Sequence, residues 1–361
     1  MFENTLYKLK KCKKFTVAYF GGSITEGAGA SDEERLCWRA LTTAWLRERY
    51  PECEITEVQA AIGGTGSELG AYRCDVDLAS KKPDLIFYEY SVNDYGTNYT
   101  SLTNNTEATF RKIYKENPTA DIVVLHTMTK HVSENLDAGY EFSSRSAHTM
   151  MAHYYNVPCF EMGEILRSKI KADGGDWLKY TLEGVHPNDE GYAVYFEGLK
   201  SWLQNHLDRA RAIDAPIEKK LPKRLFDDVT TLEFARMEDS YSAELGEGWS
   251  KVEKSLCCRY PHYIEASEPG AELTFKFTGR RIGIYFMLAN DSGDLEYSID
   301  GGESHTMRTW DSYCVEFSRA GHSMLFCDLE HGEHVLKIKV IDEKADISEG
   351  NSIRIGTFLV S

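Results

Sequence analysis

The 361-residue sequence contains no long hydrophobic run. No stretch approaches the ~18 apolar residues that a membrane-spanning helix needs. The basic N-terminal segment, MFENTLYKLKKCKK, is not followed by the ~7 to 15 apolar residues and small-residue cleavage site of a signal peptide. We therefore expect no membrane partner, and the cytoplasm is the expected location.

Positive charge is also scarce. Lys and Arg total 41 against 57 Asp and Glu, which gives a formal net charge of −16 with neutral histidine. Proteins that bind nucleic acids carry net basic patches, so we expect no nucleic-acid partner. Hydrophobic residues make up 42% of the chain and aromatic residues 12%, which excludes a wholly disordered protein.

The cysteines follow no recognisable pattern. Their number is odd, and they show neither CxxC spacing nor a histidine-bearing zinc pattern. Neighbouring residues of one strand point to opposite faces, so the adjacent Cys257 and Cys258 are interpreted as separate thiols rather than a redox pair. We interpret all nine as buried or reduced thiols: Cys12, Cys37, Cys53, Cys74, Cys159, Cys257, Cys258, Cys314 and Cys327.

The chain is longer than the ~250 to 300 residues at which single hydrophobic cores stop growing, which predicts two domains. Residues 1–210 alternate short apolar runs with helical patterns, as in an α/β domain with a parallel sheet flanked by helices. A capping box at Ser31 and Glu34 predicts a helix start, and Asn188 caps a last helix over 189–206. The predicted strands are 15–20, 54–60, 84–90, 121–126 and a short fifth at 157–160.

Residues 211–228 are charged and contain Pro216 and Pro222, as is typical of a linker. Residues 229–361 change to a period of two, with short strands separated by Gly, Asp, Asn and Ser turns. The sequence Asp300-Gly301 is a hairpin signal. This part is predicted to be an all-β sandwich.

Four blocks of the first domain carry groups suited to acyl transfer. Ser23, in FGGSIT, follows the end of a strand, where ligands bind in open α/β sheets. The glycine-rich loop 61–67 can expose backbone N–H groups, and Asn93, in YSVND, can donate to an oxyanion. His186, in EGVHPN, can take the proton of Ser23 while Glu183 holds its other nitrogen. Each block alone is typical of a turn, but the four together predict catalysis.

In this order the blocks resemble those of the SGNH hydrolases, the GDSL-like lipase and esterase superfamily, over roughly residues 15–206. The resemblance implies that Ser23 is the nucleophile and His186 the general base. It also implies an oxyanion hole made of Gly64, Asn93 and the Ser23 amide. Two-step acyl transfer by such a set requires no metal and no organic cofactor.

Two positions depart from the family pattern. Gly22 stands where the usual Gly-Asp-Ser has its Asp, and no catalytic group is lost by this change. Glu183 stands where the family has the Asp of an Asp-x-x-His pair, and its side chain is one methylene longer. Asp176 or a backbone carbonyl is the alternative partner of His186.

The predicted sandwich resembles carbohydrate-binding modules, particularly the family 35-like ones. The whole arrangement resembles the acetyl-mannan esterases of carbohydrate esterase family 17. This resemblance implies removal of O-acetyl groups from plant oligosaccharides, with acetylated manno-oligosaccharides as the expected substrate and partner. Trp177 and Trp310 are candidate sugar-stacking residues, and a core or surface role is the alternative for both.

Three alternatives stay open. The chain can be an esterase of the same superfamily that acts on acetylated xylan, peptidoglycan or a lysophospholipid, although it shows no apolar lid segment for long acyl chains. It can be a non-catalytic glycan-binding protein, against which the intact Ser23, Asn93 and His186 set argues. The sandwich can instead be a structural or dimer-forming module, which leaves a homo-oligomer open.

Overall fold

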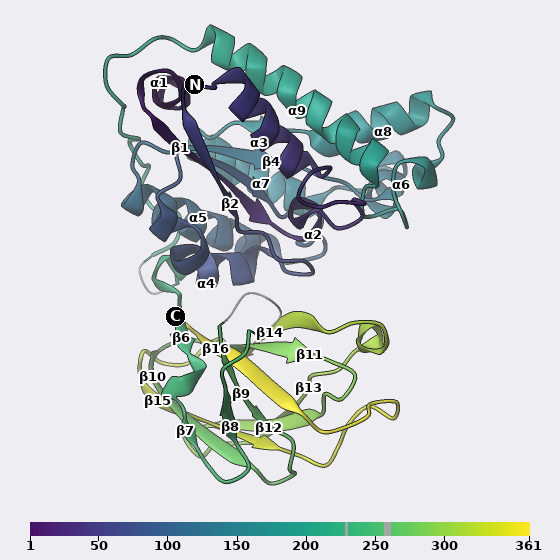
Figure 1. Cartoon of the computed structure of the whole chain (residues 1–361). Helices are drawn as coiled ribbons and strands as arrows, with labels where there is room; N and C mark the ends of the chain where they lie inside the picture. Colours follow the sequence, from purple (N-terminus) through teal and green to yellow (C-terminus); the bar gives the residue numbers. More distant parts are fainter. Residues whose placement is uncertain (228–229, 256–260) are drawn as a thin grey trace. The chain divides into compact units, whose positions relative to one another are not determined.

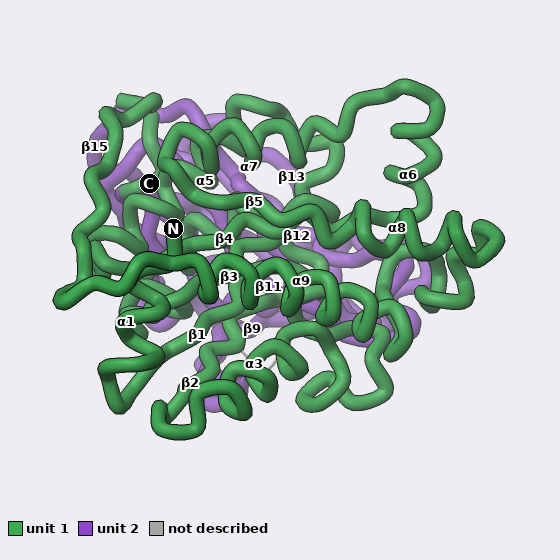
Figure 2. Tube along the Cα trace, turned by 90° about the horizontal axis from the view of Figure 1, so that it is seen from above, with its two compact units in different colours: residues 1–233 green, residues 234–361 purple. Residues whose placement is uncertain are grey.

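The computed structural model describes residues 1–227, 230–255 and 261–361. The chain forms two compact units, unit 1 (Met1–Glu233) and unit 2 (Phe234–Ser361), which are green and purple in Figure 2. The predicted domain boundary at 228/229 and the thiols of Cys257 and Cys258 lie outside the described residues. Unit 1 holds a parallel sheet with helices and unit 2 holds antiparallel sheets, so the predicted fold class is confirmed.

Unit 1 is built on a parallel sheet of β1 (Lys14–Gly21), β2 (Glu54–Gln59), β3 (Leu85–Glu89), β4 (Asp121–Leu125) and β5 (Cys159–Phe160). The strand order is β2-β1-β3-β4-β5, and the five predicted strands are all present. Successive side chains of a strand point to opposite faces, so Val17 and Tyr19 of β1 enter one core and Ala18 and Phe20 the other.

Helices cover both faces of this sheet (Figure 1). One face packs against α1 (Glu3–Lys11), α3 (Trp38–Arg49), α8 (Met162–Ala172) and α9 (Asp189–Arg209). The other packs against α4 (Ser67–Asp77), α5 (Tyr99–Glu116) and α7 (Ser143–Tyr154). The shorter elements are α2 (Ser23–Glu26), α6 (Lys130–Asp137) and the 3₁₀ turns η1 (Ala79–Lys81) and η2 (Trp177–Lys179). The result is a three-layer α/β sandwich.

The helix start predicted at Ser31 and Glu34 is wrong. Ser31 donates instead to the carboxylate of Asp189, from its hydroxyl at 2.6 Å and its backbone N–H at 2.8 Å. As a result α3 begins only at Trp38. The predicted cap at Asn188 is confirmed, because its side chain accepts a backbone N–H of the first turn of α9 at 3.1 Å.

The segment 211–227, predicted to be a linker, is held on unit 1. The buried carboxylate of Glu107 accepts the N–H of Leu225 at 2.9 Å, and the N–H of Ile217 donates to the side chain of Asn4 at 2.7 Å. These tertiary hydrogen bonds satisfy backbone groups that a free linker would leave to water. The segment therefore behaves as part of unit 1.

Unit 2 consists of two antiparallel sheets. The first contains β7 (Glu244–Leu245), β10 (Glu272–Gly279), β12 (Asp294–Ile299), β13 (His305–Arg308) and β15 (Gly332–Val340), in the order β13-β12-β15-β10-β7. The second contains β8 (Ser250–Val252), β9 (Tyr263–Ala266), β11 (Ile282–Leu288), β14 (Arg319–Phe326) and β16 (Ile353–Val360), in the order β14-β11-β16-β9-β8, with β6 (Arg236–Asp239) paired to β16. The 3₁₀ turns are η3 (Leu232–Phe234), η4 (Ser240–Ser242) and η5 (Ser312–Val315).

The two sheets of unit 2 pack face to face. Phe275 of the first sheet stacks on Phe358 of the second, with ring centroids 3.9 Å apart in a shared core. The predicted hairpin turn is confirmed, because Asp300 and Gly301 both have positive φ, 53° and 72°. The central strand β16 does not show the alternation of apolar and polar residues, because nearly all its residues are buried, on both faces.

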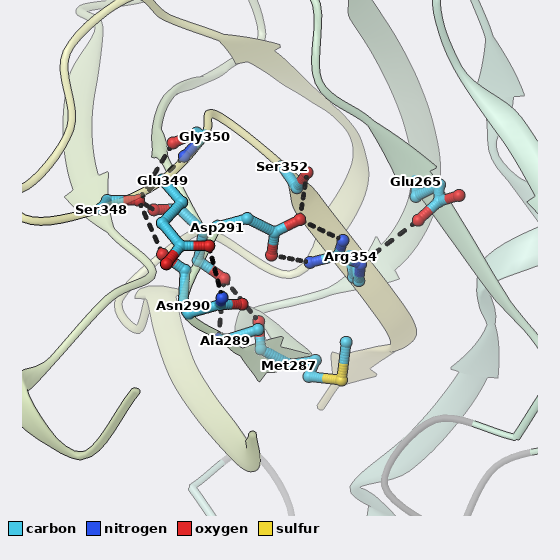
Figure 3. Close-up of polar contacts among 11 residues, drawn as sticks. Glu265, Met287, Ala289, Asn290, Asp291, Ser348, Glu349, Gly350, Ser352 and Arg354 are labelled. Atoms are coloured by element: carbon cyan, nitrogen blue, oxygen red, sulfur yellow. Dashed lines mark hydrogen bonds and ion pairs between the residues drawn. The ribbon is translucent and has the colours of Figure 1, made fainter. Parts of the chain in front are cut away.

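An ion-pair cluster joins the loops at one end of the sandwich (Figure 3). The guanidinium of Arg354 makes two hydrogen bonds to Asp291, at 2.8 and 2.7 Å, and a third to Glu265 at 3.2 Å. The hydroxyl of Ser352 donates to the same Asp291 carboxylate at 3.0 Å. Bidentate pairs of this kind fix geometry as well as charge, so Asp291 holds its loop against β16.

This cluster predicts a pH-dependent stability of unit 2. Hydrogen bonds from Arg354 hold the pKa of Asp291 below its usual value. A carboxyl with a lowered folded-state pKa stabilises the fold above its unfolded-state pKa of about 4, and this contribution is lost as the pH falls through the folded-state pKa. We expect Asp291→Asn to lower the unfolding free energy by about 1 kcal/mol at neutral pH.

Urea unfolding of the full chain between about pH 3 and pH 7 measures this difference. Wild type and Asp291→Asn should converge as the pH falls below about 4. Glu303→Gln, which changes an exposed carboxyl on the β12–β13 turn, is the matched control and should follow wild type. A constant difference between wild type and Asp291→Asn over the whole range would contradict the prediction.

Candidate active site

Ser23 lies at the start of α2, where the turn after β1 approaches the end of β3 very closely. A Cβ on Gly21 would overlap the carbonyl oxygen of Glu89, and a Cβ on Gly22 would overlap the side chain of Asn93. Only glycine permits such an approach of backbone to backbone and of backbone to side chain. The two glycines therefore bring Ser23 and Asn93 side by side.

A chain of hydrogen bonds runs from Ser23 through His186 to Glu183. Ser23 Oγ lies 2.8 Å from His186 Nε2, and His186 Nδ1 is hydrogen-bonded to the Glu183 carboxylate. With Nδ1 donating to the carboxylate, Nε2 is the acceptor for the serine proton. The arrangement can deprotonate Ser23 and hold the imidazolium that forms.

The loop before α9 accommodates the longer side chain of Glu183. Gly184 has φ +87°, a left-handed conformation that favours glycine, and its carbonyl accepts the N–H of Lys130 at 2.7 Å. The N–H of Leu182 donates to the carbonyl of His186 at 2.9 Å, which closes the loop. This tight turn brings the Glu183 carboxylate within hydrogen-bond distance of His186 Nδ1.

Two predicted donors lie beside Ser23. Gly64 has φ +70°, and a Cβ on the neighbouring Gly63 would lie 3.5 Å from Ser23 Cβ. Within the part of the chain that the structure describes, neither the Gly64 N–H nor the Asn93 side chain makes a hydrogen bond. The Ser23 N–H lies in the first turn of α2, where amides have no intrahelical acceptor. These donors can bind an oxyanion that forms at Ser23.

Buried polar groups support this edge of the sheet. Glu89 accepts the hydroxyls of Thr25 at 2.8 Å and Thr127 at 2.5 Å, and burial raises the pKa of its carboxyl. His126 lies 2.9 Å from the hydroxyl of Thr149, and burial holds the pKa of its ring well below the usual range. An acidic residue inside the apolar run LIFYEY is the signal that points to Glu89.

Three other sequence candidates take no part in the hydrogen bonds that link Ser23, His186 and Glu183. Asp176 accepts the N–H of Leu178 at 2.9 Å as the cap of η2, so it does not orient His186. Trp177 is 8% exposed and packs in the core of unit 1, which is the alternative that the sequence left open for it. Trp310 is half-buried against the core of unit 2.

Within residues 1–227, 230–255 and 261–361, no group of three or more His, Cys, Asp or Glu side chains has a geometry that could hold a metal ion. Over the same ranges, no helix is both long enough and apolar enough to cross a membrane. No disulfide links the cysteines that the structure describes.

Solved structures similar to this chain include a two-domain esterase (CEX) active on acetylated mannans, which is 20% identical with a TM-score of 0.84 over 100% of this chain and 95% of the other. The same esterase co-crystallized with mannopentaose gives 20% identity and a TM-score of 0.83, over 99% of this chain and 93% of the other. The acetyl xylan esterase AlAXEase is 21% identical, with a TM-score of 0.43 over 53% of this chain and 99% of the other.

The sequence itself matches a known family over most of unit 1. Residues 19–194 match the profile of the GDSL-like lipase/acylhydrolase family, whereas the comparison with curated proteins gives no match. The matched range contains Ser23, Gly64, Asn93 and His186, the residues that form the candidate active site described above. The matched segment belongs to the GDSL-like lipase/acylhydrolase family, and the unit that contains it is a carboxylic ester hydrolase.

Proposed function

We propose that the protein is a serine carbohydrate esterase that removes O-acetyl groups from plant oligosaccharides, with acetylated manno-oligosaccharides as its substrate. The observation that carries the proposal is the contact of Ser23 Oγ with His186 Nε2 at 2.8 Å. Glu183 is hydrogen-bonded to the other ring nitrogen of His186. The Gly64 N–H and the Asn93 side chain lie beside Ser23 and have no partner in the described structure. Such a set is suited to acyl transfer at an ester.

The reaction proceeds in two steps. His186 takes the proton of Ser23, and the serine oxygen attacks the acetyl carbonyl carbon. The carbonyl oxygen becomes an oxyanion, which the Ser23 and Gly64 amides and the Asn93 side chain stabilise. His186 then protonates the sugar oxygen as the C–O bond breaks, which leaves acetyl-Ser23. A water molecule, deprotonated by His186, attacks this ester, and His186 returns the proton to Ser23 Oγ as acetate leaves.

The choice of substrate draws support from the similarity over both units to an esterase active on acetylated mannans. The net charge of −16 is compatible with a neutral sugar ester, because it disfavours polyanionic ligands. We place the enzyme in the cytoplasm, where it would meet short imported glycans.

We also propose that unit 2 binds the glycan. It presents Tyr313 and Phe317, which are 59% and 52% exposed with ring centroids 6.1 Å apart. An exposed aromatic pair of this kind offers apolar faces on which a sugar ring can stack.

Acetate release from defined oligosaccharides tests the main proposal. Wild type should release acetate faster from acetylated manno-oligosaccharides than from acetylated xylo-oligosaccharides or peptidoglycan fragments, and Ser23→Ala should lower the rate by roughly 10⁵- to 10⁶-fold. Retained hydrolysis in Ser23→Ala would remove the mechanism. A preference for acetylated xylan, peptidoglycan, a lysophospholipid or a long-chain ester would assign a different substrate.

The Glu183 carboxylate is expected to matter for turnover. Glu183→Ala should reduce kcat on p-nitrophenyl acetate by roughly 10²- to 10⁴-fold, because His186 loses the group that orients its ring and stabilises its charged form. Asp176→Ala removes a carboxylate that caps η2 and makes no hydrogen bond to His186, and it should keep the wild-type kcat. Equal kcat values for wild type and Glu183→Ala would show that Glu183 plays no part.

Tyr313→Ala tests the role of unit 2. We expect KM for an acetylated oligosaccharide to rise about tenfold, which corresponds to the loss of one aromatic contact. KM for p-nitrophenyl acetate should not change, because this small ester has no sugar to stack. An unchanged KM for both substrates would remove Tyr313 from glycan binding.

A further inference from the structure

The loop that carries Gly64 is bracketed by two carboxylates. Glu26 Oε2 accepts the N–H of Gly63 at 2.8 Å, and Asp94 Oδ1 accepts the N–H of Ser67 at 2.8 Å. The amide of Gly64 lies between these two in the sequence and makes no hydrogen bond within the described residues. The amide just before Gly64 and the amide of Ser67, three residues after it, are thus occupied, whereas the amide assigned to the oxyanion is not.

Each carboxylate belongs to an element that also carries a group of the proposed site. Glu26 lies in α2, one turn after Ser23. Asp94 directly follows Asn93 in the turn after β3. The two hydrogen bonds therefore tie the loop to the nucleophile on one side and to the second oxyanion donor on the other.

Glycines make room for both carboxylates. A Cβ on Gly63 would lie 2.7 Å from Glu26 Oε2, and a Cβ on Gly66 would lie 2.5 Å from Asp94 Oδ1. A loop this rich in glycine has many accessible backbone conformations when nothing holds it. Charge-assisted hydrogen bonds to its amides restrict it to one conformation.

Asp94 is itself held from the opposite side. Its Oδ2 lies 2.9 Å from Nε2 of His148, whose side chain is completely buried on α7. His148 Nδ1 has no hydrogen-bond partner among the described atoms, so the proton lies on Nε2 and is donated to Asp94. Asp94 is 3% exposed and cannot turn toward water. Its orientation is therefore fixed by Ser67 and His148 together.

We infer that Glu26 and Asp94 are positioning residues that hold the oxyanion loop in register with Ser23 and Asn93. This inference rests on the proposed function. Oxyanion donors act at 2.7 to 3.1 Å, and a displacement of about 1 Å can cost roughly 10²-fold in rate. Glu26 binds the backbone amide of Gly63 and Asp94 binds that of Ser67, so both are assigned a positioning role rather than a catalytic one.

Steady-state kinetics of the full chain on p-nitrophenyl acetate test this inference. Glu26→Ala and Asp94→Ala should each lower kcat by about 10- to 100-fold with KM within about twofold of wild type, because the donors are displaced in the transition state. Asn93→Ala removes a donor completely and should lower kcat by roughly 10²- to 10³-fold, which is the loss against which the two alanine variants are compared.

Conservative variants separate positioning from folding. In Glu26→Gln a carbonyl oxygen can still accept the amide of Gly63, so at least about tenfold of the alanine loss should return. Asp94→Asn keeps an acceptor for Ser67 but turns an NH₂ group toward the Nε2–H of His148, so it should recover less. Glu34→Ala is the matched control, because Glu34 bonds Arg39 with a 78% exposed side chain and does not touch the loop. Its kcat should equal that of wild type.

The concentration of folded sites is measured by the final extent of organophosphonate labelling. Wild-type kcat in both alanine variants overturns the inference. A loss of kcat that merely follows the labelled fraction, or that Glu26→Gln does not recover, overturns it as well. Failure of the proposed function has a different signature, which is ester hydrolysis that persists in Ser23→Ala. The two failures are therefore distinguishable.

Discussion

The close approach of the β1–α2 turn to the end of β3 is the contact on which the site of unit 1 depends. Gly21 lies against the carbonyl of Glu89, and Gly22 lies against the side chain of Asn93. In this structure the side chain of Asn93 fills the space that a side chain at position 22 would need. A larger residue at either glycine would separate Ser23 from Asn93.

The order of the strands brings the other groups of the site close to this contact. Because β1 lies between β2 and β3, the loops that follow these three strands meet at one edge of the sheet. His186 reaches the same edge from the loop before α9, which Gly184 folds back on itself. Groups separated by more than a hundred residues in sequence thus come within hydrogen-bond distance.

The acidic composition has a structural use beyond solubility. Several carboxylates act as internal acceptors: Glu107 holds the segment 211–227, Asp94 holds the start of α4, and Asp291 holds a loop of unit 2. Each accepts from backbone amides or a guanidinium, which are strong charge-assisted contacts. With no disulfide among the described cysteines, such hydrogen bonds fasten the irregular segments.

Local sequence patterns are enough to predict the strands of unit 1, the hairpin turn at Asp300 and the order of the four blocks, because these depend on alternation and on neighbours a few residues away. Other features depend on contacts between distant segments. Ser31 bonds Asp189, 158 residues distant, and not Glu34; Trp177 enters the core; and Glu183 rather than Asp176 meets His186. Local signals offer each polar group several partners, and packing selects one by bringing distant segments together.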